Sequence, residues 1–229
     1  MTERVMEHRT SAVYKLVPSE IRNLTSEHAL GNLRPGQGYK VESIRDWRPD
    51  FAFSHIFHFH LEERGRMFSF EEFREWSTLD RFQPMFHTPA WEKIKEAIAG
   101  GYSEQEAKNS LRWRIGIAYY SFVREMYVVA RFRELGLDAR FHPLADALFR
   151  TDTWIGDTSV ALYIRNDAFR NGKVGRKPPA EKILGGEESG LKFIGLGIPT
   201  QPIWGEVHFP DDRAVEDCAG KLRILTAQR

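Results

Sequence analysis

The chain contains a single cysteine, Cys218, among its 229 residues, so a disulfide scaffold is excluded and a reducing, cytoplasmic location is expected. It lacks any apolar run near the ~20 residues that cross a bilayer, and its first residues lack the apolar segment of a secretory signal. The net charge is only +1 and aromatic residues make up 13%, which excludes global disorder. We therefore expect a folded protein without membrane contact, in which Cys218 is a small buried hydrophobe.

Positive charge is concentrated in the middle of the chain. The segment 108–182 holds 14 Lys and Arg residues against 8 Asp and Glu residues, whereas the remainder holds 19 against 24. Clustered Lys and Arg favour a polyanion partner, because their contacts with phosphates release condensed counterions. A solvated basic face would have the same composition. The asymmetry indicates nucleic acid as the first partner to consider. DNA is expected ahead of RNA, although charge alone does not distinguish them.

Residues 1–103 are expected to form an N-terminal α+β region. The aromatic run over 51–60 predicts a strand. A capping box beginning at Ser69 predicts the start of a helix, because Glu72 follows three residues later. A further helix is expected over 90–99, ended by the glycine pair that follows it.

A second capping box, at Ser103, opens the longest helical pattern of the chain, over about 104–135. Beyond Gly136 the apolar period changes to two, which predicts strands joined by short turns. The expected elements are strands at 140–144, 146–155 and 159–165, a turn at Gly156-Asp157, a helix at 180–184, strands at 191–198 and 203–209, and a last helix from Asp211. This order indicates an α/β or α+β domain over residues 104–229.

The apolar seam of the long helix contains one acid, Glu125. Apolar residues at alternating spacings of four and three occupy positions 111, 115, 118, 122, 129 and 132, and Glu125 fills the gap. Burying an unpaired carboxylate costs several kcal/mol, so it requires a cation, a hydrogen-bond partner or a metal. A salt bridge to an arginine such as Arg165 is the structural alternative.

Two more acids, Asp146 and Asp152, are expected on one face of the strand 146–155, because side chains two apart share a face. Acids are poor strand formers, so two on one face indicate a site. Positions at the strand start and at its solvent edge are the alternative. The next turn would bring Tyr163 and Arg165 beside Asp152, so that acids and a basic residue converge.

The pattern resembles the PD-(D/E)XK nuclease superfamily, in which a helix acid precedes a β-hairpin that supplies an Asp and then an acid-x-Lys pair. The resemblance rests on the spacing and hydrophobic pattern from Thr151 to Arg165, and it extends over about residues 104–209. It implies a restriction-endonuclease-like mixed sheet flanked by helices. It also implies a metal-dependent endonuclease of a mobile element or defence system, with Mg²⁺ or Mn²⁺ held by Glu125, Asp146 and Asp152.

The chain departs from that family at the acid-x-Lys pair, where Tyr163 and Arg165 stand. Tyrosine is a poor Mg²⁺ ligand, and arginine stabilises a phosphate but cannot act as a general base. The resemblance still makes Asp152, Tyr163 and Arg165 the expected catalytic residues. The candidates for the missing acid are Glu125, Asp146 and Glu181. The alternative is a nuclease fold that has lost its metal and binds DNA or RNA as a subunit of a larger complex.

A basic loop over 166–179 adds to the expectation of nucleic-acid contact. Its candidate binding residues are Arg170, Lys173, Arg176 and Lys177. They are spread over glycine-containing backbone that can follow a phosphate chain. The loop is not a P-loop, because it lacks the four-residue spacer and the Ser or Thr after the lysine. A solvated loop is the alternative.

Three histidines, His55, His58 and His60, lie in the aromatic run. On a strand, His58 and His60 would share a face and offer imidazole nitrogens to Zn²⁺. No cysteine or acid at ligand spacing completes the set, so packing among the neighbouring phenylalanines is the stronger interpretation. The same aromatic region supports a further hypothesis, a protein–protein adaptor.

Overall fold

A computed structural model describes residues 15–24, 29–49, 53–165, 179–185, 190–199 and 207–227. The contacts within the chain divide it into two units. We call residues 22–122 and 203–207 the helical unit, and residues 1–21, 123–202 and 208–229 the sheet unit. The division falls inside the long helix α8 (Glu104–Glu134), whereas the sequence places a boundary ahead of residue 104.

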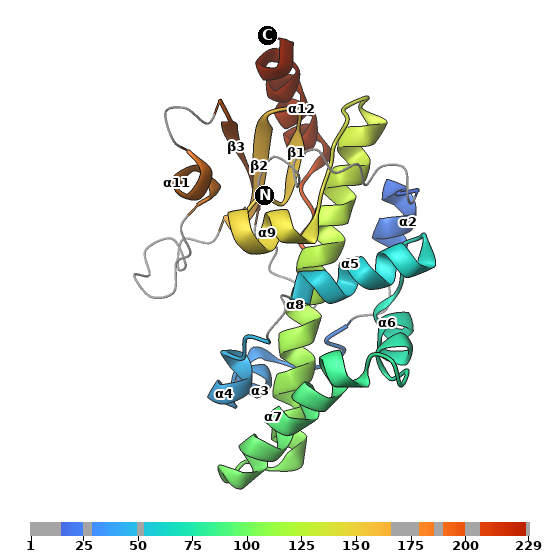
Figure 1. The fold of residues 1–229 in the computed structure, drawn as a ribbon, viewed down its shortest axis with the longest axis vertical. Helices are drawn as coiled ribbons and strands as arrows, with labels where there is room; N and C mark the ends of the chain where they lie inside the picture. The colour runs from blue at the N-terminus through green and yellow to red at the C-terminus, as the bar shows by residue number, and fades with distance from the viewer. Residues whose placement is uncertain are drawn as a thin grey trace. The chain divides into compact units, whose positions relative to one another are not determined.

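The described part of the helical unit consists of helices. They are α3 (Pro35–Gly38), α4 (Glu42–Arg45), α5 (Phe53–Arg64), α6 (Phe70–Ser77), the π-helix η2 (Gln83–His87), α7 (Thr88–Ala99) and the first part of α8, while α2 (Pro18–Asn23) lies across the division. Figure 1 shows these helices in blue to green.

The strand expected at 51–60 is wrong, because residues from Phe53 onward form α5. Its buried residues recur mainly at helical spacings of three and four: Phe53, Ile56, Phe57, His58, His60 and Leu61. The strand expectation relied on aromatic β-propensity, which measures packing on a half-buried surface and is overridden here by the tertiary environment.

The local helix signals are confirmed. Ser69 Oγ accepts a hydrogen bond from the Glu72 N–H at 3.1 Å, and the Glu72 carboxylate accepts one from the Ser69 N–H at 2.8 Å. The same reciprocal pair forms between Ser103 and Glu106 at the start of α8. Both boxes satisfy N–H groups that a helix start leaves without intrahelical partners.

The core of the helical unit is built of aromatic rings. Phe57 lies against Phe73 and Phe122, with ring centroids 4.8 Å and 5.4 Å away. Phe68 stacks on Phe122 at 5.5 Å. The Tyr119 hydroxyl donates to the Phe68 carbonyl at 2.7 Å, so this buried ring keeps its polar end satisfied.

The sheet unit combines helices with a small mixed sheet. It contains the second part of α8, α9 (Pro143–Phe149), β1 (Thr153–Ile155), β2 (Thr158–Arg165), α11 (Ala180–Leu184), β3 (Lys192–Pro199) and α12 (Asp212–Ala227). β1 and β2 form an antiparallel hairpin, and β3 pairs with β2 in parallel (Figure 1). The expected mixed α+β class is thereby confirmed.

Several expected elements of this unit are confirmed: the long helix, the turn at Gly156-Asp157, the strand at 159–165, the short helix at 180–184, the strand at 191–198 and the last helix. The strand expected at 203–209 is not tested in full, since 203–206 lie outside the described residues. Residues 207–209, which are described, are not in a strand.

The strands expected at 140–144 and 146–155 are wrong for most of their length. Arg140 makes only an isolated bridge to Trp154, and residues 143–149 form α9. Pro143 at the first helical position and the His142 side chain, which accepts from the Leu144 N–H at 3.1 Å, start this helix. Only the last residues of the expected strand are extended, as β1.

Alternation along the strands defines two faces of the sheet. Lys192, Leu196 and Ile198 belong to one face, on which Lys192 Nζ donates to the Leu225 carbonyl at the end of α12. The other face carries Asp152, Trp154, Ser159, Ala161, Tyr163 and Arg165. Trp154 is fully buried there against Ala145 of α9, which crosses in front of the strands in Figure 1.

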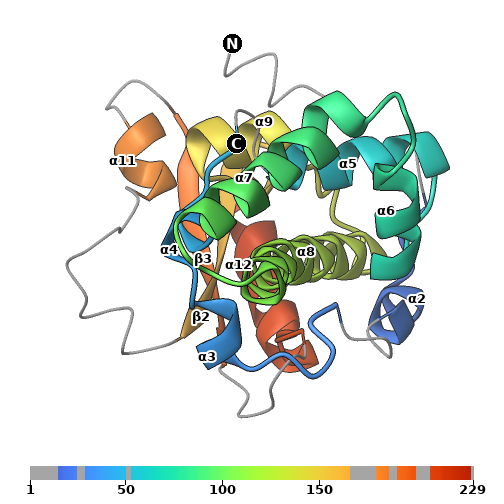
Figure 2. The ribbon, with the colours of Figure 1, turned by 90° about the horizontal axis from the view of Figure 1, so that it is seen from below.

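Two further expectations concern α8 and α12. Helix α8 has 31 residues, and Figure 2 shows it nearly along its axis. None of the described helices, α8 included, is both long and apolar enough to span a membrane. Cys218 in α12 is 5% exposed, as expected of a small hydrophobe. Its burial raises the pKa of the thiol to about 11, so the thiolate is disfavoured.

Candidate functional site

The candidate site begins on α8, where Glu125 follows Arg124. Glu125 is 6% exposed, and its seam neighbours Phe122 and Val129 are 2% and 0% exposed. The prediction that the buried seam continues through this glutamate is therefore confirmed. Arg124, half-buried, is the preceding residue on the helix.

The second acid, Asp146, lies in the first turn of α9 rather than on a strand. The helix ends at Arg150, whose φ of 59° places it in the left-handed region. Arg150 is the only residue other than glycine with positive φ in the described chain. This turn reverses the chain after α9 and leads it into Asp152 and β1, so Asp146 and Asp152 are brought together by a helix and a turn.

The third acid, Asp152, lies at the entry to the hairpin. Its N–H donates to the Val160 carbonyl at 3.2 Å, and its carboxylate accepts from the Leu162 N–H at 2.5 Å. The neighbouring Thr151 hydroxyl lies 2.9 Å from the Ser159 hydroxyl. These bonds tie Asp152 to β2, and the Leu162 N–H fixes the position of its carboxylate.

The electrostatic environment of Glu125 disfavours its charged form. Burial raises the pKa of Glu125 well above its ordinary value of 4.5, and the negative charge of Asp146 raises it further. The positive charge of Arg124 lowers the pKa but does not offset these effects. The surroundings of Glu125 therefore favour its neutral form over its charged form.

The surroundings of Asp152 also disfavour its charged form. Burial of its carboxyl group raises its pKa well above 3.8, and the charges of Glu125 and Asp146 raise it further, against the Leu162 N–H and Arg124, which lower it. Burial lowers the pKa of Arg124, while Asp152 and Glu125 raise it. Among the described residues, Arg124 is a cation whose charge acts on both acids, whereas the sequence analysis proposed Arg165 for this role.

The three carboxylates and one guanidinium leave an excess of negative charge when ionised. Carboxylate oxygens are the hard ligands that Mg²⁺ and Mn²⁺ prefer. Within the described ranges, no set of three or more His, Cys, Asp or Glu side chains is arranged to hold a metal ion. The donor chemistry fits an open Mg²⁺ site, in which one or two carboxylates bind the ion and water or substrate phosphate completes its coordination.

Tyr163 and Arg165 share the sheet face of Asp152 but lie further along β2. Tyr163 is 46% exposed and Arg165 is exposed as well. Glu181, the alternative acid, is exposed on α11. The candidate phosphate-binding residues of the basic loop, Arg170, Lys173, Arg176 and Lys177, lie outside the described residues.

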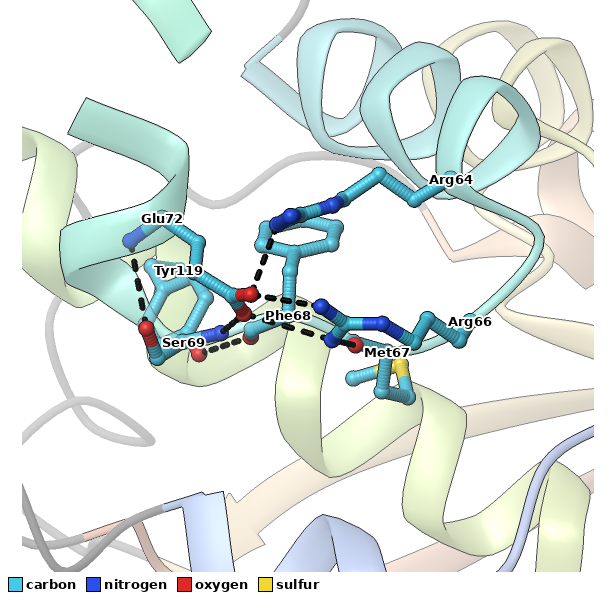
Figure 3. Close-up of polar contacts among 7 residues, drawn as sticks. All are labelled: Arg64, Arg66, Met67, Phe68, Ser69, Glu72 and Tyr119. Carbon is cyan, nitrogen blue, oxygen red and sulfur yellow. Dashed lines mark hydrogen bonds and ion pairs between the residues drawn. The ribbon is translucent and has the colours of Figure 1, made fainter. Parts of the chain in front are cut away.

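A polar cluster of the helical unit provides a contrast (Figure 3). Glu72 accepts from Arg66 at 2.7 Å, forms an ion pair with Arg64 at 2.7 Å and caps its own helix through Ser69. Burial alone would raise the pKa of Glu72, but Arg66, Ser69 and Arg64 together lower it below 4.5. This carboxylate has partners that favour its charge, and its role is structural.

The histidine cluster is part of the aromatic core. His58 and His60 are each 1% exposed. His60 lies between the rings of Phe68 and Trp76, at centroid distances of 4.3 Å and 4.4 Å. On a helix, residues two apart point in widely different directions, so the shared face expected for Zn²⁺ does not exist. Packing, the stronger interpretation of the sequence, agrees with these contacts.

Arg124 was missed by sequence reasoning, although a signal was present. It is the residue directly before the seam acid, and a basic neighbour of a buried acid is a candidate counter-charge.

Comparison of the chain with protein-family models, with curated proteins and with solved structures finds no match. The functional argument therefore depends on the acidic site itself.

Proposed function

We propose that the sheet unit carries a divalent-cation-dependent phosphodiesterase site that acts on nucleic acid, as in the PD-(D/E)XK nucleases. Glu125 and Asp152 would hold Mg²⁺ or Mn²⁺, with Asp146 as the third acid. The observation that carries the proposal is the position of three carboxylates from α8, α9 and the hairpin: Glu125 is buried, Asp152 is held by the Leu162 N–H, and the charge of Asp146 acts on both.

The electrostatics favour a functional over a structural role for these acids. Neighbouring acids that raise the pKa of a buried carboxyl group favour its protonated form. Here Asp146 raises the pKa of both Glu125 and Asp152, Glu125 raises that of Asp152, and Arg124 lowers both. Strongly perturbed acids held together in this way are typical of active sites.

The order of elements also supports the proposal. An acid-bearing helix is followed by a hairpin whose first strand is entered through Asp152, then by α11 and by a strand parallel to β2. The nuclease resemblance likewise places an acid-bearing helix ahead of a hairpin whose first strand supplies an Asp. In this chain the strand ahead of the hairpin is reduced to the bridge at Arg140, and α9 is inserted.

The residues suggest a division of roles in phosphodiester hydrolysis. A bound Mg²⁺ would lower the pKa of water and stabilise charge on the phosphate. The attacking water must lose a proton, and arginine cannot accept it, so the acceptor is a carboxylate such as Asp146. Water oxygen adds to phosphorus, the ester P–O bond breaks, and the leaving oxygen takes up a proton from solvent. Arg165 would contact the phosphate oxygens.

A second candidate is a nucleic-acid-binding module without catalysis. It is favoured by one observation, the presence of Tyr163 and Arg165 where the nuclease family has an acid and a lysine. Such a module would bind DNA or RNA as a subunit of a larger complex, and the acids would hold a proton in place of a metal.

Cleavage of plasmid and of single-stranded DNA in Mg²⁺ and in Mn²⁺ tests the first candidate. The wild-type protein is expected to cleave only with a divalent ion, and Asp152→Asn to reduce the rate at least about 100-fold, since it removes a metal ligand. Asp138→Asn is the matched control, because Asp138 is exposed and paired with Arg140. Salt-sensitive binding without cleavage under either ion would favour the second candidate.

A further inference from the structure

Two glycines on β3 stand beside the two residues that depart from the nuclease pattern. The parallel register pairs Ala161 with Gly195 and Tyr163 with Gly197. Paired positions of neighbouring strands share a face, so Gly195 and Gly197 belong to the face of Tyr163. Glycine weakens a strand, and its presence in a strand interior often marks a close approach by another group.

The approaching groups are the side chains of Tyr163 and Arg165. A Cβ atom on Gly195 would lie 2.9 Å from Tyr163 Cε1. A Cβ atom on Gly197 would lie 3.0 Å from the Tyr163 hydroxyl oxygen and closer still to Arg165 Nε. Both side chains therefore lie across β3 in space that any other residue at these positions would fill.

This arrangement places a guanidinium and a phenolic hydroxyl next to one another. Both polar atoms lie within 3.0 Å of the same point above Gly197. A guanidinium offers several N–H donors in a fixed plane, and a tyrosine offers one O–H donor. Donors grouped on an exposed surface suit the oxygens of a phosphate, to which arginine binds in a bidentate manner.

We propose that Tyr163 and Arg165 form a phosphate-binding pair for the nucleic-acid backbone, and that Gly195 and Gly197 are positioning residues that let the pair lie flat on the sheet. The inference deepens the proposed function and rests on it. It gives a role to the tyrosine and arginine that stand where the nuclease family has an acid and a lysine. The pair would bind the phosphate, while Asp152 on the same sheet face and Glu125 of α8 would hold the metal.

The test is binding of a short fluorescent double-stranded DNA by the full chain in EDTA, across a series of salt concentrations. Arg165→Ala is expected to weaken binding about 10-fold and to reduce the slope of log K against log salt by about 0.9, the value for one lost phosphate contact. Tyr163→Phe is expected to weaken binding about 3-fold with the slope unchanged, since it removes one uncharged donor.

A double-mutant cycle separates positioning from a merely structural effect. Gly197→Ala is expected to weaken binding about 5-fold in the wild type and to have no further effect when Arg165 is already alanine. Gly220→Ala is the control, because no atom lies within 4 Å of the added Cβ in α12. An equal loss from Gly197→Ala in both backgrounds, or an unchanged salt slope in Arg165→Ala, would overturn the inference.

The two proposals fail in different ways. If the binding pattern holds and no divalent ion supports cleavage, the phosphate pair stands and the enzymatic proposal falls. If the protein cleaves DNA but Arg165→Ala and Tyr163→Phe bind as the wild type does, the pair is wrong and the enzyme stands. Tyr163→Phe keeps the test valid even if Gly197→Ala fails to fold, because it changes only an exposed hydroxyl.

Discussion

Glu72 of the helical unit and Glu125 of the sheet unit are both helix glutamates in partly or fully buried positions, yet their environments are opposite. Glu72 is held by Arg64, Arg66 and a helix cap, and its pKa is lowered. Glu125 lies near two other acids and one arginine, and its pKa is raised. The difference teaches that burial alone does not indicate function. The sign of the surrounding charge distinguishes the structural carboxylate from the candidate functional one.

The largest expected effect concerns the aromatic core, whose role is stability alone. Phe68→Ala is expected to lower the free energy of unfolding by about 3–5 kcal/mol, because a fully buried ring in contact with Phe122 is lost. Phe59→Ala, at a 43% exposed position, should cost much less. Urea unfolding measures both changes, and similar values for the two variants would contradict this account of the core.

The next effect is a pH dependence that originates in the helical unit. Burial lowers the pKa of His60 from 6.5 to about 4, with the charge of Arg64 as a second cause. Neither ring nitrogen of His60 has a hydrogen-bond partner among the described residues. The folded state therefore binds fewer protons than the unfolded state below pH 6.5, so stability is full above that pH and is lost as pH falls towards 4.

His60→Phe cannot take up a proton at this position. The variant is therefore expected to keep about 2 kcal/mol of the unfolding free energy that the wild type loses as pH falls from 6.5 towards 4. The measurement is the difference in unfolding free energy between variant and wild type at several pH values from 7.5 to 4.5. A difference that does not change with pH would show that His60 is not the source.

A matched pair of glutamate substitutions tests the comparison directly. Glu125→Gln is expected to stabilise the metal-free protein at neutral pH by about 1–2 kcal/mol, because glutamine is neutral without the proton that the buried glutamic acid must take up on folding. Glu72→Gln is expected to destabilise it by about 1 kcal/mol, because ion pairs with two partly exposed arginines are lost. Thermal and urea unfolding provide the measurement, and changes of the same sign would break the comparison.

The pH dependence of the Glu125→Gln effect has a defined direction. The folded-state pKa lies above the ordinary value of 4.5, so the stability contributed by Glu125 is present below that value and is lost as pH rises towards the folded pKa. The advantage of Glu125→Gln over the wild type should therefore grow with rising pH, opposite to the trend from His60.

The smallest expected effect is at the turn between α9 and Asp152. Arg150→Gly should raise the free energy of unfolding by about 0.5–1 kcal/mol, because glycine adopts the left-handed conformation without steric cost. Replacing Arg150 by alanine keeps the strain and serves as the control. A loss of stability in Arg150→Gly would mean that the arginine side chain stabilises the turn in another way.

The sequence predicted those features whose signals are local. The capping boxes at Ser69 and Ser103, the seam of α8 and the turn at Gly156-Asp157 each depend on residues a few positions apart. Position 125 could be predicted as buried because it completes a seam of four-three spacing. The class of mixed α+β fold followed from the order of these elements.

The remaining features depend on contacts between distant segments. The alternation of His and Phe in α5 suggested a strand, but tertiary packing made it a helix. Asp146 was expected beside Asp152 on a strand and reaches it through α9 instead. The role of Arg124 depends on how α8 is rotated, and that of Gly195 and Gly197 on a parallel register, and neither can be inferred from spacing alone.

The central claim, that the acids of the sheet unit form a divalent-cation site, is tested most directly by thermal unfolding of the protein with and without Mn²⁺. An ion that binds only the folded state at about 100 times its dissociation constant stabilises that state by about 2.7 kcal/mol. We predict a rise of several degrees in the unfolding temperature of the wild type and no rise in Asp152→Asn or Glu125→Gln. An equal rise in all three proteins, or no rise in the wild type, would contradict the account.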